Sequence, residues 1–332
     1  MSYSDRHLVF GGAPPGSPWG TLGAVAAGAL EPLGYRVKIE AEASMGRCPG
    51  LVHTGLLELG ANQTMTTRWA YLGIRAYAQG GPMSRLRTLA TIMMPAWLGI
   101  AVRWETGITD LAQVGLRQYP LRVLGGGRDL FDSIWAHYGL SHELIESWGG
   151  VFQPAPRRAP GSTWTMAPWV RTGEFDLIME PLYAANTIEA CYWQEASVLH
   201  NLRFLELPEE LIMRMCADLG VGAYAGSIPF RLVRGVDRPV RTIYRPLQGY
   251  LARDDMPEDF AYLFARALDE GRALLRQTHI PFSYDERTVA MDVGVPLHPG
   301  AMRYYREMGY PLSPPTNAVS LSARVSSAEF VM

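Results

Sequence analysis

Hydroxyl, indole, guanidinium and carboxyl side chains gather at two glycine-rich turns, which are the best candidates in this sequence for holding an anion. The first turn carries Ser17 and Trp19 just before a predicted helix, and the second, residues 125–129, carries Arg128 and Asp129 after three glycines. Free N–H groups at a helix start attract anions, and an arginine there can clamp a carboxylate. The simpler interpretations are a turn that only begins a helix, a solvated Arg128, and Asp129 as an N-cap.

Five further residues stand at or near the ends of predicted strands. Ser44 ends one strand, Asn62 and Thr64 belong to the polar run NQTMTT, and Glu180 and Tyr183 follow the apolar strand FDLIM. Open α/β sheets place their ligands at the carboxyl ends of strands, so all five are candidate ligand-binding residues. A carboxylate such as Glu180 binds a ligand amine or acts as a base, and Tyr183 offers a ring for stacking. The alternatives are an N-cap at Ser44 and a polar turn over NQTMTT.

Catalytic motifs are poor. The sequence has no HExxH, no GxSxG, no GxxxxGK[ST] and no zinc spacing of Cys and His, so we expect no metal. The first glycine turn lacks the GxGxxG spacing, and two prolines fill it, so we expect no dinucleotide or other cofactor. If the chain is an enzyme, its acid/base candidates are Glu180, His298 and Asp129. His298 stands between two prolines, and we interpret it as a structural hydrogen-bond donor.

The elements that must position these residues alternate along the chain. A strand over 7–12, a helix over 21–35 and a strand over 35–44 predict a parallel βαβ unit. Residues 48–61 have a helix-like pattern, and residues 62–77 are expected to hold a strand and then a loop. Apolar strands follow over 86–94 and 97–104, and a second strand, glycine loop and helix repeat the arrangement. The clearest amphipathic helix begins at Glu258, with acidic residues in its first turn as the helix dipole prefers.

Composition limits the class of protein. The chain has 332 residues, 48% hydrophobic and 19% charged, with a net charge of -2, which is enough for two cores and gives no nucleic-acid footprint. No apolar stretch reaches the ~20 residues of a membrane span, so no direct membrane insertion is expected. The start shows no secretory signal, which implies a cytoplasmic protein if Met1 is the native start and a periplasmic one if the chain is a matured form.

Residues 295–312, VPLHPGAMRYYREMGYPL, contain a short, strongly punctuated helix. The two prolines exclude helix before Gly300, and Gly309 suits the end of the helix. Tyr304, Tyr305 and Met308 fall on one edge, which predicts that they pack while the charged residues between them stay in water. This segment therefore predicts a fixed structural post.

With the first glycine loop, EAEASMG and TGEFDLIMEP, this segment resembles the TAXI family, the substrate-binding receptors of one class of TRAP transporters. The resemblance covers residues 7 to 312. It implies a type II periplasmic-binding-protein fold: two α/β lobes, each a mainly parallel sheet flanked by helices, joined by two crossing strands. Lobe one would comprise residues 1–97 and 244–332, and lobe two residues 98–243. The family binds small carboxylates between the lobes and delivers them to a membrane permease.

The resemblance therefore implies a small-molecule carboxylate ligand, a TRAP permease as partner, and a monomer or weak dimer. The chain departs from the family pattern at the second glycine loop and at NQTMTT. These departures indicate that the contacts of lobe one and lobe two with the ligand are altered. The rings of Trp19, Trp69, Trp97 and Tyr183 would suit an aromatic or bulkier acid. Two alternatives stay open: a cytoplasmic lyase, decarboxylase or isomerase on the same fold, acting on an aromatic or dicarboxylic acid, and a ligand sensor without transport.

Overall fold

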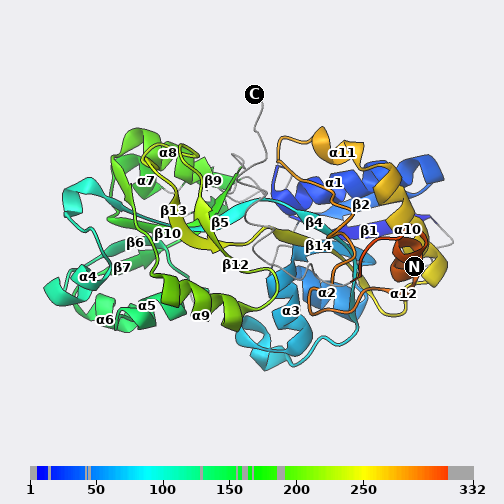
Figure 1. The fold of residues 1–332 in the computed structure, drawn as a ribbon, viewed down its shortest axis with the longest axis horizontal. Helices are drawn as coiled ribbons and strands as arrows, with labels where there is room; N and C mark the ends of the chain where they lie inside the picture. Colours follow the sequence, from blue (N-terminus) through cyan, green and yellow to red (C-terminus); the bar gives the residue numbers. More distant parts are fainter. Residues whose placement is uncertain are drawn as a thin grey trace. The chain divides into compact units, whose positions relative to one another are not determined.

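The chain folds into two compact units, each with its own sheet (Figure 1). The computed structural model describes residues 6–13, 16–41, 43, 46–127, 130–154, 156–158, 164–166, 168–184 and 191–312. Unit 1 contains the described residues up to Pro95 and from Pro246 onward, and unit 2 those from Ala96 to Arg245. The chain thus passes twice from one unit to the other. The candidates Ser44, Arg128 and Asp129 lie outside the described residues.

Unit 1 is built on a sheet with the strand order β2-β1-β3-β14-β4. The strands are β1 (His7–Gly11), β2 (Arg36–Glu40), β3 (Leu59–Gln63), β4 (Leu86–Met93) and β14 (Leu247–Arg253). The pairs β1–β2 and β1–β3 are parallel, so the predicted βαβ unit is confirmed. Because β14 returns from unit 2, it inserts antiparallel between β3 and β4.

Helices cover both faces of this sheet. They are α1 (Pro18–Leu30), α2 (Cys48–Thr54), α3 (Thr64–Leu72), α10 (Glu258–Glu270), α11 (Ala273–Arg276) and α12 (Pro299–Glu307), with 3-10 turns η2 (Glu31–Leu33) and η3 (Arg75–Gly80). The Tyr250 hydroxyl of β14 donates to Leu22 O of α1 over 2.9 Å, which fixes α1 on one face. On the other face, Gly60 leaves room for the Cys48 sulfur of α2.

The expectation for residues 48–77 was wrong in its element types. The helix ends at Thr54, where Gly55 takes the left-handed conformation, and Leu59–Gln63 is a fully buried strand. Thr64 then begins α3, where a loop was expected. The polar run misled the prediction because its side chains are satisfied inside the fold: the hydroxyls of Thr66 and Thr67 both donate to Gln63 O.

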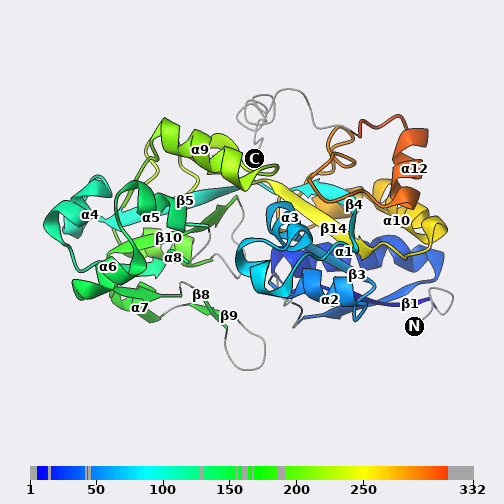
Figure 2. The ribbon, with the colours of Figure 1, turned by 90° about the horizontal axis from the view of Figure 1, so that it is seen from below.

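The C-terminal post is confirmed as a helix beside α10 (Figure 1; Figure 2 shows the same neighbours). Tyr304 donates to the buried Asp269 carboxylate over 2.7 Å, and Tyr305 donates to Leu89 O over 3.0 Å. Met308, by contrast, is 49% exposed and does not join the packed edge. His298 caps the helix through Nδ1, which accepts the Gly300 N–H over 3.3 Å.

Unit 2 holds a seven-stranded sheet with the order β12-β13-β5-β10-β6-β7, with β11 also paired to β5. The strands are β5 (Ala96–Arg103), β6 (Arg122–Gly125), β7 (Val151–Gln153), β10 (Leu177–Tyr183), β11 (Leu202–Phe204), β12 (Tyr224–Ile228) and β13 (Val240–Tyr244), beside a separate hairpin of β8 (Pro156–Arg158) and β9 (Trp164–Met166). The helices are α4 (Ala112–Arg117), α5 (Asp132–His137), α6 (His142–Ser147), α7 (Pro168–Thr172), α8 (Cys191–Leu199) and α9 (Glu209–Leu219), with the 3-10 turn η4 (Trp104–Thr106).

Both sheets are mixed, which corrects the expectation of mainly parallel ones. Among the described strands of unit 2, only the pairs β10–β6 and β6–β7 are parallel. The incoming strand β5 runs antiparallel to β10, β11 and β13, so antiparallel pairs dominate there. The core of this unit packs Trp193 and Phe175 against the apolar face of β10. Within the described ranges, no helix is both long and apolar enough to cross a membrane.

Candidate functional site

Three of the sequence-predicted residues in unit 1 converge on the first residues of β14. The Trp19 indole N–H donates to Gln248 Oε1 over 3.2 Å, and the Thr64 hydroxyl donates to Leu247 O over 3.2 Å. Asn62 pairs in register with Gly249. We call Trp19, Asn62, Thr64 and Gln248 the unit-1 cluster. Ser17 stands next to it as the N-cap of α1, where its Oγ accepts the Gly20 N–H over 3.0 Å.

Hydrogen-bond chemistry fixes the orientation of both amides in the unit-1 cluster. An indole N–H only donates, so Gln248 must turn its oxygen to Trp19 and keep its NH₂ as a donor. The hydroxyls of Thr66 and Thr67 both donate to Gln63 O. Each hydroxyl oxygen therefore acts as an acceptor for Asn62 Nδ2, over 3.2 and 3.1 Å. Gln248 Nε2 and Asn62 Oδ1 then meet no partner among the described residues, although both residues are 0% exposed.

An unpaired buried donor or acceptor costs about 1–3 kcal/mol, so such atoms in a folded protein ordinarily meet water or a ligand. One donor and one acceptor of this kind thus lie near the starts of α1 and α3. Helix starts also present free backbone N–H groups. The unit-1 cluster can therefore donate to and accept from a bound polar group.

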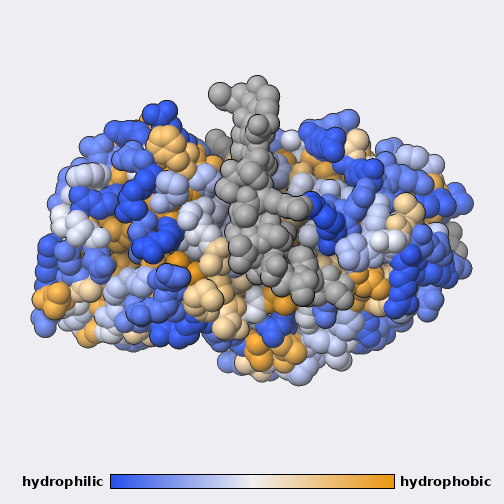
Figure 3. Space-filling model, in the orientation of Figure 1, coloured by the Kyte–Doolittle hydropathy of each residue, from blue (hydrophilic) through white to orange (hydrophobic). Residues whose placement is uncertain are grey.

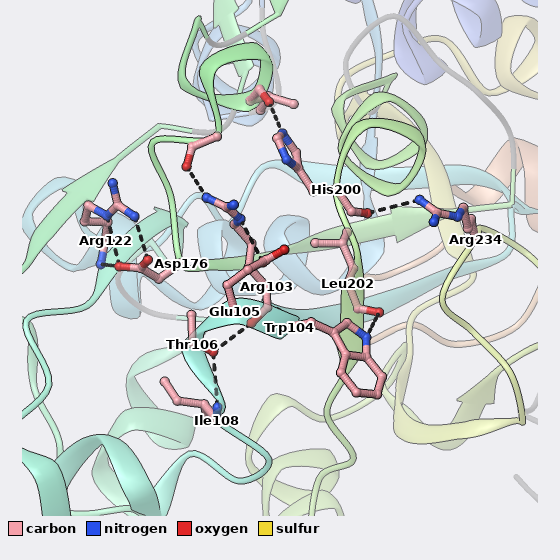
Figure 4. Close-up of polar contacts among 12 residues, drawn as sticks. Arg103, Trp104, Glu105, Thr106, Ile108, Arg122, Asp176, His200, Leu202 and Arg234 are labelled. Carbon is pink, nitrogen blue, oxygen red and sulfur yellow. Dashed lines mark hydrogen bonds and ion pairs between the residues drawn. The ribbon is translucent and has the colours of Figure 1, made fainter.

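In unit 2, the carboxyl of Glu180 is positioned by the packing of β10 between β5 and β6. At the beginning of β10, Asp176 accepts from the guanidinium of Arg122 over 2.7 and 3.0 Å and from the Arg122 backbone N–H (Figure 4). That anchor sets the parallel register in which Met179 faces Gly125. Glu180 then lies against Gly125, where a Cβ would collide with its Oε1.

Further hydrogen bonds stabilise the part of unit 2 around the start of β10 (Figure 4). Arg103 donates to Gly173 O and the Trp104 indole donates to Leu202 O. His200 Nε2 contacts Val170 O, and Arg234 donates to backbone carbonyls at the end of α8. These bonds tie β5, β11, α7 and α8 together around the segment that leads into β10.

The glycine loop after β6 is held in a defined conformation. Gly125 and Gly126 both have positive φ, at 80° and 66°, and Gly126 N donates to Met179 O over 2.7 Å. The carbonyl of Gly126 receives the Trp135 indole N–H over 3.5 Å and contacts His142 Nε2 at 2.9 Å. The loop is therefore pinned to the sheet next to Glu180.

Burial changes the protonation of Glu180. Its side chain shares a strand face with Ile178 and Leu182 of the apolar core, and part of the residue stays exposed. Burial raises the pKa of this carboxyl to about 8, while the positive charge of Arg245 acts in the opposite direction. Glu180 is thus mostly protonated at neutral pH.

We call a second set of residues the unit-2 cluster. Its members are Gly125, Glu180, Tyr183, Tyr244 and Arg245. Arg245 donates its backbone N–H to Ala96 O, and Ala96 pairs with Tyr183. Arg245 is 5% exposed, and burial lowers the pKa of its guanidinium to about 10, so it stays charged. The buried Tyr244 hydroxyl meets no partner among the described residues.

Sequence reasoning missed Arg245 and Gln248. The available signal was an arginine and a glutamine around Pro246 in an otherwise apolar run, IYRPLQGYL, at the second passage between units. His298 is a buried helix cap and forms no hydrogen bond with the described residues of the unit-1 cluster. Across the ranges that the structure describes, no three His, Cys, Asp or Glu side chains gather as metal ligands.

Three of the four candidate aromatic walls are covered by protein. Trp19, Trp69 and Trp97 are each 4% exposed or less. Trp97 packs on Tyr244 at 5.4 Å between ring centroids, and Arg75 covers Trp69 at 4.9 Å. Of the four, only Tyr183 keeps part of its surface exposed, so the rings do not favour an aromatic ligand.

The model of the NMT1-like family matches residues 190–309. No curated protein matches the chain. Three similar solved structures are a periplasmic transporter (12% identity, 98% of this chain and 97% of that chain, TM-score 0.47), a TctC solute-binding protein from Polaromonas (15%, 84% and 90%, 0.43), and a TRAP periplasmic solute-binding protein from Sulfitobacter with bound β-D-galacturonate (12%, 82% and 80%, 0.42). With TM-scores below 0.5, none of them assigns a ligand. The chain is a mixed α/β protein of two units whose residues 190–309 match the NMT1-like family.

Proposed function

We propose that the protein is a periplasmic solute-binding protein of TAXI type that binds a small organic carboxylate. The observation that carries this proposal is the placement of Glu180 against Gly125 near the buried Arg245, whose charge acts on the Glu180 carboxyl. A neutral carboxyl and a guanidinium both donate hydrogen bonds, and a carboxylate is a group that only accepts. One ligand carboxylate would accept from both, with the glycine loop beside it.

The unit-1 cluster supplies the complementary contacts in this proposal. Gln248 Nε2 would donate to a second oxygen of the ligand, and Asn62 Oδ1 would accept from a ligand hydroxyl or amine. A receptor of this type would close on its ligand by a hinge motion. Arg128 and Asp129 follow the glycine loop in the sequence and remain predicted contacts.

The proposed function also implies the partners of the protein. A receptor of this type would deliver its ligand to a TRAP membrane permease and act as a monomer or weak dimer. The match of the NMT1-like family to residues 190–309 and the periplasmic solute-binding neighbours support this class of protein.

A thermal-shift screen of organic acids, followed by calorimetry, tests the proposal. At least one carboxylate should raise Tm and be recovered unchanged after overnight incubation. Arg245→Gln should weaken that ligand by about tenfold to a hundredfold, the scale of a charged hydrogen bond. The matched control is Arg238→Gln, which removes only an exposed arginine paired with Glu206. Stabilisation by cationic or neutral solutes alone would refute carboxylate binding.

A second candidate function is an enzyme acting on the same acids. The raised pKa of Glu180 favours it, because a carboxyl that titrates near neutral pH suits proton transfer. Consumption of the ligand in the overnight incubation, and its loss in Glu180→Gln, would establish catalysis. Recovery of intact ligand supports the receptor.

A further inference from the structure

Unit 1 carries a cavity of about 500 Å³ at the end of α10, lined by none of the residues of the unit-1 cluster. Its lining consists of Arg272, Leu275, Arg276, Phe282, Ser283, Tyr284, Asp285, Glu286 and Arg287. Leu275 and Phe282 are buried and form an apolar floor, and the arginines, Ser283 and Glu286 are exposed around them. The volume falls within the range of small-molecule sites.

Positive charge exceeds negative charge around this cavity, with three arginines against two acids. Arg287 is neutralised by Asp285, with nitrogen–oxygen distances of 2.8 and 2.6 Å. Arg272 bonds to Asp269 over 2.8 Å and to Glu286 over 3.0 Å. Arg276 has no hydrogen bond or ion pair with any described residue. Its guanidinium is thus the available cation of the cavity.

The walls of the cavity are held before any ligand arrives. Asp269, which fixes Arg272, also accepts from Tyr304 and Tyr310 over 2.7 and 3.0 Å. On the opposite wall, Ser283 exchanges both backbone hydrogen bonds with Met93 at the end of β4, which leaves its hydroxyl side exposed. A preformed cavity loses less entropy when it binds a ligand.

We propose that this cavity is a second binding site, which takes a small organic anion with an apolar body. The anionic group would pair with Arg276 and the Ser283 hydroxyl, and the apolar body would lie on Phe282 and Leu275. Hydrophilic residues predominate on the face of the molecule over α10 in Figure 3. Leu275 and Phe282 supply the apolar part of the cavity lining. The site lies entirely in unit 1 and does not depend on the carboxylate site proposed above.

Fluorine NMR with 4-fluorobenzoate and 4-fluorobenzenesulfonate on the full chain tests this site. The background variant is Arg245→Gln, so that the proposed carboxylate site does not dominate the signal. Both probes should bind, and Arg276→Gln should weaken them about fivefold, as expected for one exposed ion pair. Arg306→Gln on α12 is the matched control, because Arg306 is also exposed and its guanidinium has no partner among the described residues.

Ser283→Asp provides the second variant, because it places a negative charge in the cavity at an exposed side chain. It should abolish binding of both probes while Tm stays within about 2 °C of the parent. Fluoride or acetate binding equally well would remove the role of the apolar floor. Probe affinities that are unchanged in Arg276→Gln and in Ser283→Asp, or absent in the parent, would overturn the proposal.

Discussion

Protonation of Glu180 should make ligand binding depend on pH in a direction that reveals the charge of the ligand. Burial raises the pKa of this carboxyl to about 8. If a carboxylate accepts the Glu180 proton, only the protonated protein binds it well. The protonated fraction falls about tenfold between pH 7 and pH 9, so Kd should rise about tenfold over that interval, equivalent to ~1.4 kcal/mol.

Glu180→Gln isolates this effect, because the amide keeps a hydrogen-bond donor but does not ionise. Its Kd at pH 7 should stay within about threefold of the wild type. The rise between pH 7 and pH 9 should disappear. Calorimetric titrations at half-unit steps from pH 6 to pH 9.5 provide the measurement, with Glu206→Gln as the control. Glu206 is paired with two surface arginines, which hold its pKa below the usual range, so it does not titrate in this window.

Folding stability should depend on the same group. The pKa of Glu180 is about 8 in the folded state and 4.5 in its ordinary range. Its contribution to the free energy of unfolding is therefore complete below about pH 4.5 and is lost as pH rises through 8. Because part of Glu180 remains exposed, we expect the loss to be on the order of 2 kcal/mol. Guanidinium melts of wild type and Glu180→Gln at pH 5 and pH 8.5 measure it.

Affinity for the ligand that increases as pH rises through 8 would show that ionised Glu180 binds a cation, and would refute the carboxylate model.

Two further changes test the packing that positions the sites. Gly125→Ala should lower the free energy of unfolding by about 1–3 kcal/mol and weaken ligand binding, because the φ of Gly125 is 80° and the added Cβ collides with Glu180. Calorimetry and denaturant melts on one sample measure both effects. An unchanged Kd would show that the loop does not contribute to the site. Asp269→Asn should lower the free energy of unfolding by about 2 kcal/mol, because three donors lose a charged acceptor, whereas Glu286→Gln, which removes only a surface pair with Arg272, should change it by less than ~0.5 kcal/mol.

Local sequence signals predicted the elements that depend on a few neighbouring residues. Pro299 and Gly309 bound the last helix, and a strand followed by a helix forms at the start of the chain, although the helix covers Pro18–Leu30 and not 21–35. Glu180 could be singled out because a carboxylate follows the apolar run FDLIM, although the strand continues through Glu180 to Tyr183. These signals act within one or two turns of the chain, where proline, glycine and side-chain alternation restrict the backbone directly.

The tertiary structure decided which polar atoms are satisfied and which are left for a ligand. The partner of Trp19 is Gln248, 229 residues away, and Thr64 bonds to a carbonyl 183 residues away. Those pairs exist because β14 returns from the second unit and inserts between β3 and β4. The sequence alone determined that polar groups stand at strand ends and helix starts. Only the long-range strand order decided that Arg245 accompanies Glu180, because such pairing depends on register between distant segments and not on local pattern.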